Sequence, residues 1–111
     1  MSELEILSVA ASGMDAQRTL LDVAARNVAA AEAAGPNATY DRMVPEFRVF
    51  DDEERGAIVE FEGARLQRRS TAGMLAEMIA VMNASRAYES NASLFDVGKT
   101  LAEKTIELGR L

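Results

Sequence analysis

Hydrophobic positions in the first third of the chain recur at alternating steps of three and four residues. The stripe comprises Leu7, Ala10, Met14, Gln17, Leu21, Ala24, Val28 and Ala31. This heptad-like spacing is typical of a helix that packs against another helix. Ser2 followed by Glu5 is a capping-box pattern at a helix start, and Gly35-Pro36 is a stop signal. The pattern therefore predicts one helix from Ser2 to about Ala34.

The last third of the chain repeats this spacing over a longer stretch. One stripe comprises Met78, Val81, Ser85, Tyr88, Ala92, Phe95, Lys99, Ala102 and Ile106, and a second stripe beside it comprises Leu94, Val97, Leu101, Leu108 and Leu111. The pattern predicts a second helix from about Thr71 to Leu108. Two adjacent stripes make an apolar face wider than one partner helix would cover.

Between the predicted helices the pattern changes to the short period of strands. Ala57, Val59 and Phe61 alternate with Ile58, Glu60 and Glu62, as in a half-buried strand. Together with residues 46–50, on the other side of an acidic turn at 51–54, this predicts a short β-hairpin. A lone hairpin is barely stable in water, so we expect it to lean on a helix or on a neighbouring chain.

These elements predict a mainly α fold in one structural unit. Residues 1–34 form the N-terminal helix, 35–70 a loop with the hairpin insertion, and 71–111 the C-terminal helix. The two long helices are expected to pair as an antiparallel coiled coil. Such a pair leaves one apolar side uncovered, which favours oligomerisation or docking.

Composition narrows the classes of function. The chain has no Cys and no His, which excludes thiol nucleophiles, disulfides and Cys/His zinc sites. A net charge of −6 argues against nucleic-acid binding. We find no phosphate loop, nucleophile elbow or metal cluster. We therefore expect a protein that is not an enzyme and has no cofactor, metal or catalytic residues.

The first residues carry Glu3 and Glu5 and no basic residue, unlike the positively charged start of a secretory signal peptide. No apolar run is long enough to span a bilayer. By these criteria alone the protein would be cytoplasmic and would not insert into a membrane.

Three smaller features each have two interpretations. We interpret the acidic run 51–54 as a solvated turn rather than a cation site, because it lacks the spaced oxygens of a calcium loop. The basic cluster Arg65, Arg68 and Arg69 favours ion pairs over nucleic-acid contact. Met74, Met78 and Met82 share one helical face, where core packing is favoured over a promiscuous peptide groove.

Two passages resemble the flagellar basal-body rod and hook axial proteins. Residues 11–18 (Ala-Ser-Gly-Met-Asp-Ala-Gln-Arg) and 20–29 (Leu-Leu-Asp-Val-Ala-Ala-Arg-Asn-Val-Ala) resemble the family motif Ser-Gly-Met/Leu-x-Ala-Gln with its following Ala-Ser-Asn-Ile/Leu-Ala-Asn. Residues 78–91 resemble Met-x-x-Ala-Ser-Arg-x-Tyr-Glu-Ala-Asn. The resemblance covers most of both predicted helices, in the same order.

Other passages are similar to the proximal rod branch of this family. They are residues 99–110, with Thr-Ile-Glu-Leu-Gly-Arg at 105–110, and the sequence Gly35-Pro36 followed by Tyr40 and Phe47. The chain departs from the family at Arg26, where the motif has Ser, and at Ala30, where it has Asn. Its middle segment is also shorter, without the usual Pro- and Gly-rich stretch.

The resemblance implies a structural subunit that polymerises through its terminal helices into the axial drive shaft around the export channel. The implied partners are copies of itself, other flagellar rod proteins and the flagellar type III export apparatus, with the MS-ring or export gate region as a further candidate. The implied location is the periplasmic rod of the basal body, reached by export without a cleaved signal peptide. Terminal helices in this family often fold only on assembly.

The candidate subunit-interface residues follow from the helix stripes. They are Leu7, Met14, Gln17, Leu21, Asn27, Val28, Val81, Ser85, Tyr88, Asn91, Phe95 and Ala102. Asn27 and Asn91 are candidate polar contacts, because a buried Asn in a helical interface can fix register. The alternative is a soluble helical coiled-coil adaptor or chaperone module, which would explain the heptads equally well but not the paired terminal motifs.

Overall fold

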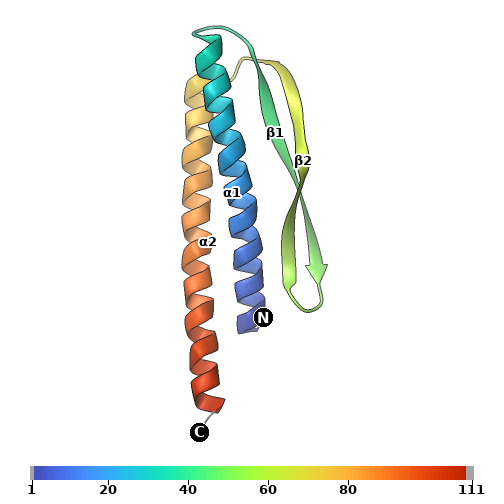
Figure 1. The fold of residues 1–111 in the computed structure, drawn as a ribbon, viewed down its shortest axis with the longest axis vertical. Coiled ribbons are helices and arrows are strands. Elements are labelled where there is room, and N and C mark those ends of the chain that lie inside the picture. The colour runs from blue at the N-terminus through green and yellow to red at the C-terminus, as the bar shows by residue number, and fades with distance from the viewer. Residues whose placement is uncertain (1, 110–111) are drawn as a thin grey trace.

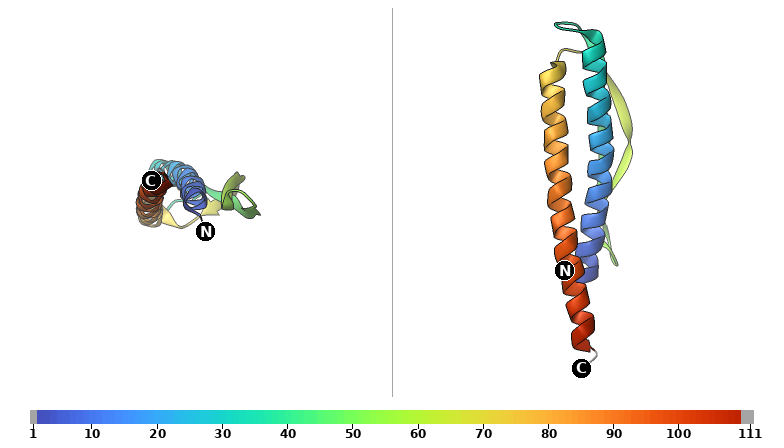
Figure 2. Two further views of the ribbon diagram at one scale, coloured as in Figure 1. Left: turned by 90° about the horizontal axis from the view of Figure 1, so that it is seen from below. Right: turned by 60° about the vertical axis from the view of Figure 1, so that its left-hand side comes forward.

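The structure, a computed structural model, describes residues 2–109 and consists of two long helices with a hairpin between them (Figure 1). The elements are α1 (Glu3–Ala34), β1 (Tyr40–Asp52), β2 (Gly56–Ser70) and α2 (Gly73–Gly109). The helices run antiparallel along the long axis of a rod-like molecule measuring 66 × 23 × 14 Å (Figures 1 and 2). The predicted mainly α fold, with its antiparallel helix pair and hairpin insertion, is confirmed. Leu111, the last member of the second stripe, lies outside the described residues.

Both ends of α1 follow the local signals of the sequence. The Ser2 hydroxyl accepts the backbone N–H of Glu5 (3.2 Å), which satisfies one of the unpaired donors at the helix start. At the other end Gly35 has a φ of 87° and donates its N–H to the carbonyl of Ala31 (3.2 Å). That left-handed conformation favours glycine, so the helix ends where Gly35-Pro36 predicted.

The hairpin is longer than the sequence predicted. β1 and β2 pair from Asp52↔Gly56 at the turn to Tyr40↔Ser70 at the base, with register shifts near both Glu46 and Tyr40. The sequence predicted strands only at 46–50 and 57–62 and so missed residues 40–45 of β1 and 63–70 of β2. Residues 64–69 have no buried side chain to mark them. These six residues are all exposed, so they are strand by backbone pairing alone.

The hairpin packs on α1, as expected for an element that is unstable by itself. Figure 2 shows it along one side of α1, away from α2. The buried residue of β2 in this contact is Ile58, whereas Phe61 is 45% exposed and stacks at an angle on Phe47 of β1 (5.7 Å between ring centroids). The predicted alternation is not seen in the burial of residues 57–62, where Ile58 is buried, Ala57 and Val59 are half-buried and the other three are exposed.

Small residues build the interior of the molecule. The buried hydrophobic residues are Ala10, Ala16, Val23, Ala24, Ala31, Tyr40, Ile58 and Ala84. Two glycines add close helix contacts, because a Cβ at Gly13 would come within 2.9 Å of the Asn91 amide, and one at Gly98 within 2.9 Å of Ile6. The helices therefore approach closely along a seam of Ala and Gly.

Candidate subunit interface

Asn27, a candidate contact between subunits, holds the hairpin on α1 within the chain. It is buried, its amide donates to the carbonyl of Met43 (2.9 Å), and its side-chain oxygen accepts the Met43 N–H (2.8 Å). Nearer the turn, the Ser12 hydroxyl accepts the N–H of Val59 (3.3 Å). Ser12 and Asn27 thus attach β2 and β1 to one face of α1.

An ion pair between half-buried Arg42 and buried Glu77 joins the base of the hairpin to α2. The Arg42 guanidinium donates to one carboxylate oxygen of Glu77 at 2.6 Å, and Glu77 is fully buried. Its second oxygen, Oε2, has no hydrogen-bond partner within residues 2–109. A buried carboxylate depends strongly on its one partner, so Arg42 fixes the hairpin to the start of α2.

The candidate interface residues line the inside of the molecule more than its surface. Asn27 is buried, and the other eleven are half-buried: Leu7, Met14, Gln17, Leu21, Val28, Val81, Ser85, Tyr88, Asn91, Phe95 and Ala102. Leu7 lies beside Gly98, and Asn91 lies against Gly13. The structure brings members of the two stripes together in the seam between α1 and α2, where part of each side chain stays accessible.

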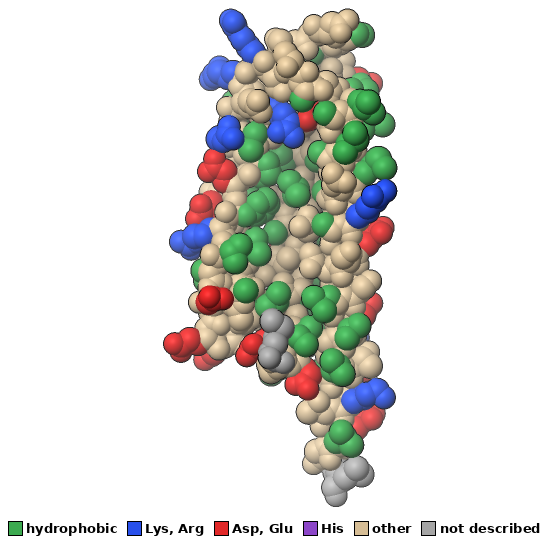
Figure 3. Space-filling view, turned by 180° about the vertical axis from the view of Figure 1, so that it is seen from behind, with side chains coloured by type: hydrophobic (Ala, Val, Ile, Leu, Met, Phe, Trp, Pro, Cys, Tyr) green, Lys and Arg blue, Asp and Glu red, His purple; other side chains and the backbone are tan. Residues whose placement is uncertain are grey.

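The free apolar surface is formed by a different set of residues on α2. The exposed large hydrophobic residues of this helix are Met74, Leu75, Met78, Ile79, Met82, Leu94, Val97, Leu101, Ile106 and Leu108. Figure 3 shows hydrophobic side chains along α2 as far as its projecting end. The second stripe predicted four of these residues, Leu94, Val97, Leu101 and Leu108. The core packing predicted for Met74, Met78 and Met82 is wrong, because all three side chains are exposed. These ten side chains meet solvent among exposed charged residues such as Arg86 and Glu89, which is more exposed apolar surface than a helix of a soluble monomer carries.

A shallow apolar hollow lies between the helices near the start of α2. Its volume is about 360 Å³, and it is lined by Ala25, Val28, Met78, Val81 and Met82. No ionisable group lines it. Methionine side chains adapt to irregular partners, so the hollow suits an apolar side chain better than a polar ligand.

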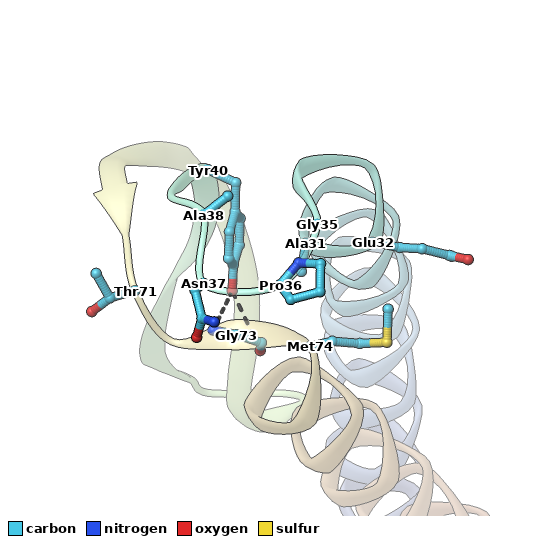
Figure 4. A pocket seen from close by; sticks show the side chains of 10 residues that line it. All are labelled: Ala31, Glu32, Gly35, Pro36, Asn37, Ala38, Tyr40, Thr71, Gly73 and Met74. Atoms are coloured by element: carbon cyan, nitrogen blue, oxygen red, sulfur yellow. Dashed lines mark hydrogen bonds between the residues drawn. The ribbon is translucent and has the colours of Figure 1, made fainter.

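A second pocket, of about 530 Å³, lies at the end of the molecule where α1 gives way to β1 (Figure 4). The Tyr40 hydroxyl accepts the N–H of Gly73 (3.1 Å) and donates to its carbonyl (3.5 Å), tying β1 to the start of α2. Apart from Tyr40, the only ionisable group that lines it is Glu32, which is exposed. The Tyr40 hydroxyl is thus already hydrogen-bonded to the backbone, and Glu32 meets solvent.

The acidic turn has the solvated form that the sequence predicted. The Asp52 carboxylate accepts the backbone N–H groups of Glu54 (2.9 Å) and Arg55 (3.0 Å). These two hydrogen bonds, helped by the Arg55 guanidinium, lower the pKa of Asp52 below its ordinary value of 3.8.

The basic cluster on β2 forms one ion pair in the structure. Arg65 pairs with Glu46 across the hairpin (3.3 Å), and both side chains are exposed. Arg68 and Arg69 are also exposed. Their charges are therefore available to a partner outside the chain.

The described residues show neither a membrane span nor a metal site. Between residues 2 and 109 neither helix combines the length and apolar content that crossing a bilayer requires. The same residues include no group of three or more acidic side chains placed to hold a metal ion. No protein-family model matches the chain, and a search of curated proteins also found no match.

Proposed function

We propose that this protein is a structural subunit of the bacterial flagellar basal-body rod, most similar to the proximal rod protein FlgC. In this function it polymerises through its terminal helices into the drive shaft around the export channel. Its partners are copies of itself and other rod proteins, and the type III export apparatus delivers it to the periplasm without cleavage of a signal peptide.

The observation that carries the proposal is the apolar outer side of α2. Ten large hydrophobic side chains on this one helix are exposed. Monomeric soluble proteins rarely leave contiguous apolar patches of more than a few hundred Å² exposed. Such a surface is suited to continuous burial against neighbouring helices, as in an assembled helical tube.

The passages that resemble the rod family give separate support, because several of their residues join the same helix pair and hairpin. Ser12, Gly13, Asn27 and Asn91 all belong to the family-like passages. Ser12 and Asn27 hold the two strands on α1, and Gly13 lets Asn91 approach the same helix. A shared motif that fixes one helix pair and its hairpin is what a family of subunits with a common packing unit would need.

Deletion of the gene in the source bacterium tests the proposal. We expect the cells to lose motility and to stop basal-body assembly before the rod is complete. An epitope-tagged copy should restore both and copurify with isolated basal bodies. Normal basal bodies in the deletion strain would reject the rod function.

A measurement on the purified chain separates the proposal from the adaptor alternative. Circular dichroism and sedimentation are recorded over a wide range of protein concentration. A rod subunit should gain helix as it self-associates. A folded monomer or dimer whose helix content is independent of concentration would favour the adaptor or chaperone module.

A further inference from the structure

The two ends of the molecule carry opposite charge. Residues 19–45 and 64–86, which make up the end with the loop between α1 and β1, contain six basic and four acidic residues. Residues 2–18, 46–63 and 87–109, which make up the other end, contain five basic and fourteen acidic residues. We call these the basic end and the acidic end. Opposite charges on unlike ends favour association of copies in the same direction.

An apolar tip projects from the acidic end. The Thr105 hydroxyl donates to the Glu3 carboxylate at the start of α1 (3.2 Å), and α2 continues beyond this point to Gly109 (Figures 1 and 2). Ile106 and Leu108 lie in this last part of the helix and are 57% and 70% exposed. Because α1 begins at Glu3, it cannot cover them. Being two residues apart, they lie on opposite sides of the helix end, so each side of this end carries one exposed aliphatic side chain. We define the apolar tip as Ile106 and Leu108.

The basic end carries a matching receptor, the apolar hollow between the helices. Its volume of about 360 Å³ is close to the lower limit of about 300 Å³ for pockets that enclose a small ligand. The two methionines in its lining, Met78 and Met82, are both about half exposed. A space of this size, with adaptable walls, can take the one or two aliphatic side chains of a helix end.

From these features we infer that the apolar tip of one copy docks in the hollow of the next copy. Met82 and Leu108 lie on the same helix about 26 residues apart, so roughly 40 Å separates the hollow of a molecule from its own tip. The contact must therefore be made between two copies. Tip and hollow are different surfaces, so the contact repeats head to tail and builds a filament or a ring rather than a two-fold pair.

This inference rests on the proposed function, because it supplies an axial contact between copies in the rod. The expected offset of roughly 40 Å is shorter than the 66 Å molecule. Successive copies would therefore overlap, which places the acidic half of one copy beside the basic half of the next. Exposed apolar side chains of α2 would be covered in the overlap.

Mixing two defective variants tests the contact. The tip variant carries Ile106→Asp with Leu108→Asp, and the hollow variant carries Met78→Asp with Met82→Asp. These positions are about half exposed or more, so we expect both variants to keep the wild-type helix signal. Each alone should associate at least tenfold more weakly than the wild type in sedimentation velocity. Their equimolar mixture should form two-chain complexes, because each partner retains one working surface.

Asn83→Asp is the matched control, since it adds a charge at an exposed position next to Met82. It should associate as the wild type does. A mixture of the two defective variants that stays monomeric would overturn the head-to-tail contact. Wild-type protein that stays monomeric throughout the concentration range, or defective variants that associate as tightly as the wild type, would overturn it too.

Disulfide trapping gives a second test, because the chain has no cysteine of its own. Ile106→Cys mixed with Met82→Cys should give a cross-linked pair under mild oxidation, and neither variant alone should. An antiparallel pairing of two α2 helices would instead cross-link Leu75→Cys with Leu101→Cys and would overturn the inference.

The two proposals fail separately. Loss of complementation with normal rod assembly of both defective variants would reject the head-to-tail contact and leave the rod function standing. Complementation of the purified variants, together with intact basal bodies in the deletion strain, would reject the rod function and keep the contact.

Discussion

The side of α2 that faces α1 and its outer side differ in the size and the exposure of their side chains. On the side that faces α1 stand small residues such as Ala84, 1% exposed, and Gly98. On the outer side stand large ones such as Leu75, 73% exposed, and Ile79. A helix that served only its own chain would bury its large apolar residues and expose its small and polar ones.

The two sides differ in how far their side chains are enclosed. Small residues such as Ala84 let α1 and α2 approach closely, and larger ones such as Tyr88 and Phe95 stay half-buried beside them. The large exposed residues of the outer side remain for surfaces beyond the chain. If this division is correct, substitutions on the inner side should change folding, and substitutions on the outer side should change association.

The largest effect on folding is expected at the one charged side chain that is buried among the described residues. Arg42→Ala leaves the Glu77 carboxylate without its partner and should lower the free energy of unfolding by about 3 kcal/mol. Urea unfolding followed by circular dichroism measures this. The double variant Arg42→Met with Glu77→Leu should recover most of the loss, since it removes the charge together with its partner. An equal loss in both variants would mean that the ion pair is not the cause.

A large residue on the inner side should force the helices apart. Ala84→Leu inserts three carbons into the closed seam and should cost about 1–3 kcal/mol in urea unfolding. Ala76→Leu is the matched control, because Ala76 is exposed on the same helix. It should change the stability by less than about 0.5 kcal/mol. Similar effects at both positions would remove the distinction between the two sides.

A polar residue on the outer side should act in the opposite way. Leu75→Ser is expected to change the stability of the dilute chain by no more than about 0.5 kcal/mol, because Leu75 makes few contacts within the chain. It should, however, weaken self-association in sedimentation equilibrium. For comparison, Val23→Ser at a buried position of α1 should lower stability several times more. A strong loss of stability in Leu75→Ser would show that the outer side supports the fold itself.

The smallest effect is expected at the turn, far from either side of α2. Because the folded chain lowers the pKa of Asp52, its hydrogen bonds stabilise the turn above pH about 4 and are lost as the pH falls through the lowered pKa. Asp52→Ala should thus lower the melting temperature slightly at pH 7 and not at pH 2. Carboxyl NMR should place the Asp52 midpoint below 3.8. A midpoint at or above that value would contradict the hydrogen-bond network.

The helices were predictable because their signals are local. The capping Ser2, the stop at Gly35-Pro36 and the heptad spacing each depend on neighbours within a few residues. The outer segments of the strands were not predictable. Residues 64–69 are all exposed, so no buried side of the strand marks them in the sequence. Gly63, with a φ of 141°, lies at a register shift that the alternation does not signal.

The candidate site was predictable in part. Periodicity identified the apolar stripes but not the partner that each one packs against. A stripe that contacts α1 and a stripe that contacts another copy have the same spacing. Asn27 shows the limit most clearly. The sequence predicted that Asn27 makes a polar contact, but not with which group. Its partner is the backbone of Met43, 16 residues away, on a strand that was predicted to begin only at residue 46.

The start of α1 and the end of α2 lie at the same end of the helix pair (Figure 1), and this governs how the fold responds to a pulling force. A force applied to the start of α1 loads the seam one turn at a time, beginning beside Thr105 and moving towards Ala31. The contacts of α1 with α2, and its hydrogen bonds to the hairpin at Ser12 and Asn27, would then open in succession. We therefore expect a weaker resistance to this pull than to a force that slides the two helices past each other, which would load all of these contacts together.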